Sequence, residues 1–160
     1  MNLLRRSFIK FTATSLASLG ALTTLAAAGL LKTTQAAAAV WNKSGFESKA
    51  VTEAIKSLGA SNAADSRDIV ITAPDIAENG AVVPVEITSN IAGTQSIAIL
   101  VEKNPQPLAA SFDVSNGGEP YVSVRLKVGA SSNITAVVKA GGKSYTASRE
   151  VKVTIGGCGG

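Results

Sequence analysis

The 160-residue chain contains no histidine and only one cysteine. Without histidine, the chain cannot build a Ser-His-Asp or Cys-His catalytic arrangement by itself. Histidine, several thiols or clustered acids are the usual ligands of transition metals, and their absence argues against a protein-bound metal. A single cysteine also rules out a C-x-x-C redox pair within the chain and the paired cysteines of antibody domains. We therefore expect a protein without a resident cofactor and without catalytic activity of its own.

The one cysteine lies in a run of glycines, Gly156-Gly157-Cys158-Gly159-Gly160. Glycine has no Cβ and adopts positive φ as readily as negative φ, so the neighbours of Cys158 impose almost no conformational preference. Five residues of extended chain span roughly 15 Å, and glycine is the slimmest backbone available. The pattern predicts a flexible Gly-Cys arm (residues 156–160) that presents a thiol to narrow sites in other proteins.

Simpler explanations of this run stay open. A glycine-rich terminus can be merely frayed, and a lone cysteine in an exported protein can be half of an intermolecular disulfide. A coupling handle added by an experimenter would have the same composition. A lipid site is disfavoured, because prenylation requires a cysteine in the fourth position from the end and Cys158 is in the third.

Residues 1–39 predict a twin-arginine export signal. Arg5 and Arg6 are followed by Ser-Phe-Ile-Lys and then by 21 residues without a charge, 11–31. That length could span a bilayer, so a membrane anchor is the alternative. The stretch is diluted by serine, threonine and glycine, and an alanine run beginning at Ala36 offers A-x-A cleavage frames. We expect cleavage within 36–40, transport by the Tat translocase to the periplasm, and no permanent membrane anchor.

Removal of this signal changes the charge of the chain. The signal holds four of the 15 basic residues and none of the 11 acidic ones, so 11 of each remain in the mature part. A formal net charge of zero leaves no basic field that would attract nucleic acid. We therefore expect no nucleic-acid partner.

Residues 40–155 have the length of one domain, and they open with a predicted helix. Ser44 and Glu47 have the spacing of a capping box. Apolar residues then recur at helical spacing over 46–58, and Gly59 can end the helix in a left-handed conformation. One short N-terminal helix is expected.

The rest of the domain predicts short strands separated by turns. The apolar or alternating segments are 69–71, 81–88, 96–102, 108–114, 121–128, 134–140 and 143–155. Gly141-Gly142 joins the last two as a two-residue hairpin, and Pro84 restricts part of its strand to an edge or a bulge. Seven short strands at this spacing predict an all-β fold, an immunoglobulin-like antiparallel β-sandwich.

Two features point to a partner protein. The twin-arginine route exports folded proteins, and in a chain without cofactor ligands we expect export together with a folded partner, as an obligate heterodimer. The segment 96–101 (Ser-Ile-Ala-Ile-Leu-Val) is also more apolar than a half-exposed strand requires. We therefore expect the partner to cover part of that sheet.

Taken together, these residues resemble the SoxY family, the sulfur carriers of bacterial thiosulfate oxidation. The resemblance rests on the export signal, the early helix, the segment 76–85 (IAENGAVVPV), the predicted sandwich and the Gly-Cys arm, and it covers essentially the whole chain. It implies a heterodimer with SoxZ. It also implies that the haem enzyme SoxXA joins Cys158 to thiosulfate as an S-thiosulfonate, that SoxB hydrolyses the terminal sulfonate to sulfate, and that SoxCD, where present, oxidises the remaining sulfur.

The chemistry of the arm agrees with a carrier. An exposed thiol is mostly protonated at neutral pH and the arm contains no base, so Cys158 is expected to be a covalent attachment point that partner enzymes activate. Two other classes stay open: an exported structural or binding sandwich whose Cys158 forms an intermolecular disulfide, and a thiol oxidoreductase, which the missing second cysteine disfavours. Asn79-Gly80 is interpreted first as a turn, with partner docking as the alternative, and Trp41 as packing either on the domain or on a partner.

Overall fold

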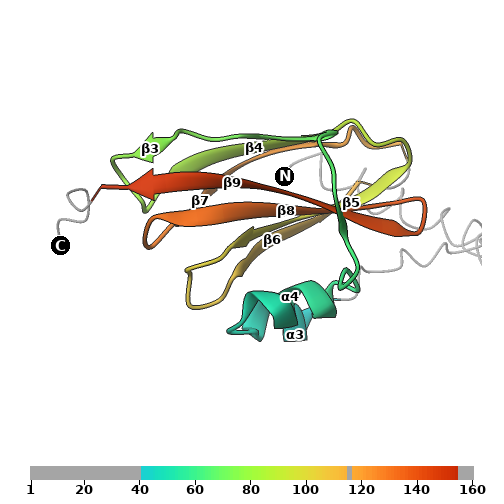
Figure 1. Ribbon diagram of the computed structural model, residues 1–160, viewed down its shortest axis with the longest axis horizontal. Helices are drawn as coiled ribbons and strands as arrows, with labels where there is room; N and C mark the ends of the chain where they lie inside the picture. The colour runs from blue at the N-terminus through green and yellow to red at the C-terminus, as the bar shows by residue number, and fades with distance from the viewer. Residues whose placement is uncertain (1–40, 115–116, 155–160) are drawn as a thin grey trace, which may run out of the picture. The chain divides into compact units, whose positions relative to one another are not determined.

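The computed structural model describes residues 41–114 and 117–154, which form two packed β-sheets with two short helices against one of them (Figure 1). The predicted all-β sandwich is thereby confirmed. The predicted export signal and the Gly-Cys arm lie outside the described residues.

The larger sheet has the strand order β1-β9-β8-β5-β6, with β3 also paired to β9, and the smaller sheet has the order β2-β4-β7. The helices are α3 (Lys43–Glu47) and α4 (Val51–Ser57). The strands are β1 (Ala64–Asp65), β2 (Ile69–Thr72), β3 (Ile76–Ala77), β4 (Val83–Ser89), β5 (Thr94–Val101), β6 (Leu108–Asp113), β7 (Tyr121–Leu126), β8 (Ser132–Ala140) and β9 (Lys143–Val153). All seven predicted strands are present, and the two-residue strands β1 and β3 are additional.

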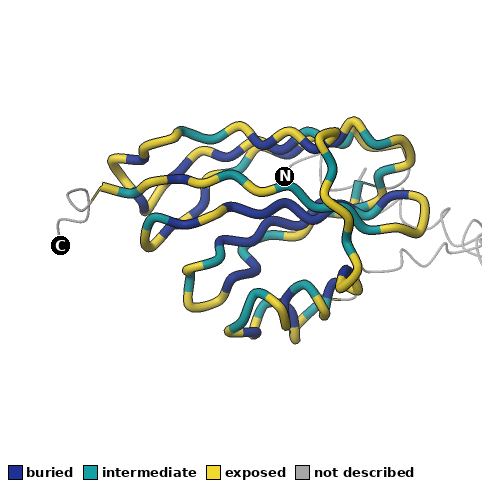
Figure 2. The backbone as a smooth tube through the Cα atoms, in the orientation of Figure 1, coloured by how far each residue is buried: buried dark blue, intermediate teal, exposed yellow. Residues whose placement is uncertain are grey.

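The main core lies between the two sheets. In β4, Val83, Val85 and Ile87 are fully buried while Pro84 and Glu86 are exposed, as the two-residue period of a strand requires. The facing residues of the larger sheet are Ile97, Ile99 and Val101 on β5 and Ile134, Ala136 and Val138 on β8. Burial of each large side chain contributes roughly 1.5–3 kcal/mol. Figure 2 shows the buried stretches concentrated along the middle strands of the larger sheet.

A second apolar cluster lies on the outer face of the larger sheet. Ala98 and Leu100 of β5 are buried there, against Ala54 and Leu58 of the helical segment. The smaller sheet covers one face of strand 96–101 and the chain's own helices cover the other. This explains why the strand is apolar on both faces. The inference that strand 96–101 is left uncovered for a partner is wrong, because the chain's own helices cover it, and β5 gives no support for a partner on this sheet.

The helical segment also differs from the single helix that the sequence predicts. Asn42 is the N-cap of α3, its side-chain oxygen accepting the N–H of Gly45 at 3.0 Å, so the predicted capping box at Ser44 and Glu47 is wrong. The Ser48 hydroxyl donates to the Gly45 carbonyl at 2.6 Å and Ser48 itself is extended, which ends α3 before α4 begins.

The folded-back packing of α3 on α4 explains this interruption. The Asn42 side chain donates to the Ser57 carbonyl at 3.2 Å, and a Cβ on Gly45 would lie 2.5 Å from the Ser57 hydroxyl. Trp41 stacks on Phe46 with ring centroids 4.4 Å apart and planes inclined by 8°, although it remains 66% exposed. Trp41 therefore packs on its own domain.

The predicted ends and turns are confirmed at three places. Gly59 follows α4 with φ +66°, and the N–H groups of Gly59 and Ala60 donate to the carbonyls of Lys56 and Ile55, which is a Schellman motif. Gly141 and Gly142 have φ of +55° and +76° in the hairpin between β8 and β9. Pro84 lies where β4 extends beyond β2 and pairs only with β7.

Candidate functional site

The strand that leads toward the Gly-Cys arm is anchored through its last described residues. Val151 of β9 is fully buried in the main core. On the outer edge of β9, the N–H of Lys152 donates to the Asp75 carbonyl at 2.9 Å, and the N–H of Thr154 donates to the Ala77 carbonyl at 3.1 Å. These bonds continue the short parallel pairing of β3 with β9, so the chain is held up to Thr154, four residues before Cys158.

A serine hydroxyl secures the other edge of β9. The N–H of Val153 donates to the Ser131 hydroxyl at 2.9 Å, and that hydroxyl donates to the Val153 carbonyl at 3.4 Å. Ser131 immediately precedes β8, whose first residue Ser132 pairs with Val151. Beyond the last β8–β9 pair, the Ser131 hydroxyl therefore replaces the β8 backbone as the hydrogen-bond partner of β9. Both edges of β9 are hydrogen-bonded at its last described residues.

The turn at Asn79-Gly80 packs against this point. The Asn79 side chain accepts the N–H of Ala81 at 2.9 Å, which forms a local turn. The N–H of Val128 donates to the Gly80 carbonyl at 2.7 Å, and a Cβ on Gly80 would lie 2.5 Å from the Val128 carbonyl oxygen and 2.8 Å from Cγ1 of Val153. The predicted turn is confirmed, and glycine is required because this position lies so close to the Val128 carbonyl and to the Val153 side chain of β9.

Asn104 fixes the loop that faces this turn. Its side-chain amide donates to the Lys127 carbonyl at 2.8 Å and its side-chain oxygen accepts the N–H of Gly129 at 3.0 Å. Val128, between them, is therefore held on both sides. We call the residues 75–80, 127–131 and 151–154 the arm base, since together they fix the exit of β9 (Figure 1).

Replacement of Gly80 by alanine is expected to destabilise the protein by about 1–3 kcal/mol, because the new Cβ meets a backbone carbonyl and a packed valine. Urea unfolding measures this difference. Gly129→Ala is the matched control, since its Cβ would lie 3.5 Å from the Asn104 side-chain oxygen, an ordinary contact, and the change should stay within about 0.5 kcal/mol. Equal stabilities for the two variants would show that the arm base is looser than described.

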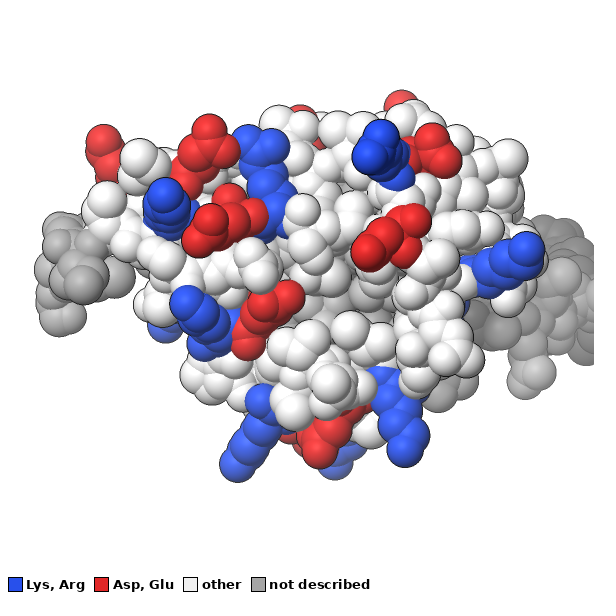
Figure 3. Space-filling view, viewed as in Figure 1, with Lys and Arg blue, Asp and Glu red and all other residues white. Residues whose placement is uncertain are grey.

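An open hollow of about 480 Å³ lies beside the arm base, lined by Asp75, Ile76, Arg149, Glu150 and Lys152. Arg149 donates to Asp75 at 2.8 Å, but the Asp75 side chain is 85% exposed, so this ion pair contributes little to stability. Figure 3 shows basic and acidic side chains interspersed over this face of the molecule, with neither sign forming a continuous field. The hollow therefore has no strong preference for an anion or a cation.

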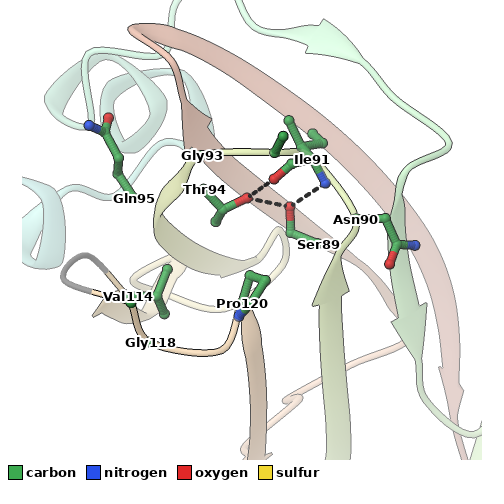
Figure 4. A pocket seen from close by; sticks show the side chains of 11 residues that line it. Ser89, Asn90, Ile91, Gly93, Thr94, Gln95, Val114, Gly118 and Pro120 are labelled. Carbon is green, nitrogen blue, oxygen red and sulfur yellow. Dashed lines mark hydrogen bonds between the residues drawn. The ribbon is translucent and has the colours of Figure 1, made fainter.

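A second hollow, of about 610 Å³, lies at the opposite end of the sandwich (Figure 4). It is next to Thr94, which pairs with the end of β8, whereas the arm base is next to the start of β8. Its hydroxyl groups bond to one another: Ser89 and Thr94 are 2.7 Å apart, and Thr94 donates to the Ile91 carbonyl at 2.7 Å. None of its described lining residues is ionisable, so these bonds close a loop and supply no acid or base.

In the described part of the chain, no three histidine, cysteine, aspartate or glutamate side chains are grouped closely enough to hold a metal ion. Nor does any helix of that part have the length and apolar character needed to cross a membrane. The predicted site residues themselves, Cys158 with its flanking glycines and the export residues Arg5 and Arg6, lie outside the described residues. What the structure adds is the anchored arm base, which sequence reasoning did not find.

Comparison with known proteins identifies the family. Residues 55–158 match the family described as sulfur oxidation protein SoxY. The solved structure of the sulfur carrier protein SoxY from Chlorobium limicola f thiosulfatophilum is 44% identical, with a TM-score of 0.56 over 62% of this chain and 93% of that chain. No curated protein matches the sequence.

Two further solved structures align weakly. One chain comes from a study of T cell activation by the bacterial superantigen toxic shock syndrome toxin-1, with 15% identity and a TM-score of 0.39 over 54% of this chain and 99% of that chain. The other is an engineered protein, with 13% identity and a TM-score of 0.39 over 54% of this chain and 20% of that chain. Neither bears on function. The family match spans well over half of the sequence and reaches Cys158, and the chain therefore belongs to the SoxY family of sulfur oxidation proteins.

Proposed function

We propose that this protein carries sulfur intermediates of thiosulfate oxidation as covalent adducts on Cys158. Membership of the SoxY family and the likeness to a solved sulfur carrier support a carrier role in sulfur oxidation. The observation that carries the finer proposal is the position of the only cysteine, four residues beyond Thr154, where β9 is bonded on both edges. A fixed base followed by Ile-Gly-Gly and then the thiol is the arrangement that a swinging carrier arm needs.

The proposed loading step forms one S–S bond. The Cys158 thiol and thiosulfate lose two electrons and one proton and give a cysteine S-thiosulfonate, with the electrons passing to the haem of the loading enzyme. Water then attacks the terminal sulfonate, sulfate leaves, and one sulfur atom stays on Cys158 as a persulfide. The chain has no histidine and the arm has no ionisable side chain other than the thiol, so the acid and base of both steps come from the partner enzymes.

We propose the partners that the family resemblance implies. These are SoxZ as the second subunit of a heterodimer and, as transient contacts, SoxXA, SoxB and, where it is present, SoxCD. The twin-arginine pattern at Arg5 and Arg6 supports export to the periplasm together with SoxZ. Because α4 covers the outer face of β5, the proposed SoxZ contact uses another part of the surface.

The mass of the natively exported protein tests this proposal. Protein purified from cells grown on thiosulfate is expected to carry mass increments of a thiosulfate group or of extra sulfur atoms on Cys158. A thiol reductant should remove them, and a Cys158→Ser protein from the same cells should lack them. A homogeneous disulfide-linked dimer without sulfur adducts would instead support the structural alternative.

A further inference from the structure

We infer that the arm base, together with the adjoining Val82, forms the docking surface for the enzymes that act on Cys158, with the exposed side chains of Ile76 and Val82 as its apolar contacts. This inference rests on the proposed carrier function and assigns it an interaction surface. The partner is an enzyme whose active site is reached through a channel wide enough for a glycine backbone.

The length of the chain between the sandwich and the thiol decides where contact must occur. Cys158 is the fourth residue after Thr154, and four fully extended residues span about 13–14 Å. An active site that holds Cys158 therefore lies within that distance of Thr154. The walls of such a site are themselves protein, so they must press against the surface that surrounds Thr154.

That surface carries two exposed apolar side chains. Ile76 is 58% exposed and lies opposite Lys152 in the β3–β9 pair, next to the bond between Ala77 and Thr154. Val82 is 50% exposed and follows Gly80 by two residues, which is at most about 7 Å of chain. Single exposed apolar residues are common on protein surfaces. Ile76 and Val82 differ from such isolated residues because the short arm requires a partner enzyme to contact the surface on which they lie.

The charges around them define the chemistry of the partner surface. Glu78, Glu150 and Lys152 are exposed, and Arg149 is paired with Asp75, so both signs are present. The docking surface therefore presents two apolar side chains within a rim of both charges, which is the usual composition of a transient protein interface. The partner surface is expected to have the same composition. Because no single sign dominates, docking should depend only weakly on ionic strength.

Enzyme kinetics on a chemically loaded carrier test the inference. Tetrathionate loads a cysteine thiolate without any enzyme, giving the S-thiosulfonate and releasing one thiosulfate. The purified sulfate-releasing hydrolase is then assayed with loaded wild-type carrier, in its native complex, and with Ile76→Asp and Val82→Asp. We expect each variant to raise the KM for the carrier about five- to thirtyfold, as loss of an interface anchor does, with little change in kcat.

Val70→Asp is the matched control. Val70 is 46% exposed and lies on β2 opposite Thr88, near the end of β4 farther from Val83 and the arm base. Its KM should equal that of the wild type, and tetrathionate should load all four proteins equally. If an aspartate variant unfolds, Ile76→Thr and Val82→Thr keep the β-branched shape and should raise KM in the same direction by a smaller factor.

The outcomes separate the two proposals. Equal KM values for Ile76→Asp, Val82→Asp and Val70→Asp, with wild-type carrier fully active, would overturn the docking surface and leave the carrier function standing. Release of no sulfate from loaded wild-type carrier would overturn the carrier function and this inference with it.

Discussion

Replacement of Cys158 by serine is expected to abolish thiosulfate consumption in a system reconstituted from this carrier and its partner enzymes. Serine has nearly the shape of cysteine, but its hydroxyl is barely ionised at neutral pH and cannot form the S–S bond that would hold the cargo. The described fold ends at Thr154, so the substitution removes no described contact. Thermal unfolding, export and partner binding should therefore equal those of the wild type.

Two readouts give this experiment its controls. Co-purification of the partner subunit with Cys158→Ser shows that assembly is intact, and the rate of thiosulfate loss reports the carrier function alone. The structural alternative predicts the opposite pattern, in which a covalent dimer is lost and thiosulfate is still consumed. Consumption at the wild-type rate by Cys158→Ser would therefore rule out Cys158 as the attachment site.

The strands were predictable because their signals are local. The inward and outward alternation in β4 follows directly from the two-residue period, and the positive φ of Gly141 and Gly142 is what a two-residue hairpin requires. Gly59 likewise ends α4 where its lack of a Cβ permits a left-handed conformation. In each case the information lies within a few residues of the feature.

The covering of β5 was not predictable in the same way. Its sequence shows that Ala98 and Leu100 need an apolar neighbour, but it does not show which one. Nor does the helical spacing of 46–58 reveal the break at Ser48, because that break depends on Asn42 reaching Ser57 across the folded-back segment. Both errors arose where tertiary contacts between distant residues decide the outcome.

In the candidate site, too, the local features could be predicted from the sequence and the features that depend on distant contacts could not. Cys158 and its glycines are a compositional signal that needs no structure to be noticed. The arm base is built from segments that are far apart in sequence, such as Gly80 with Val128 and Asp75 with Lys152. Gly80 is the one sequence signal for the arm base, and a glycine in a turn does not indicate which part of the backbone it approaches.

Replacement of Gly157 by valine is expected to lower kcat/KM with the partner enzymes by about a hundredfold, the size of loss that follows when reacting atoms are displaced by about 1 Å. A β-branched side chain restricts the backbone next to Cys158 and widens the segment that must enter the active site. Gly157 lies beyond Thr154, the last residue that the structure describes, and the substitution removes no described contact, so the unfolding temperature should stay unchanged.

A graded series identifies width as the cause. Gly157→Ala should lie between wild type and Gly157→Val, since it adds a single methyl group, and tetrathionate should load Cys158 equally in all three because a small reagent needs no channel. Slower tetrathionate loading of Gly157→Val would show that the substitution lowers the reactivity of the Cys158 thiol itself rather than the entry of the arm into the enzyme channel. Wild-type turnover by Gly157→Val with its enzymes would contradict the narrow channel, and the enzymes would then have to receive Cys158 at an open surface.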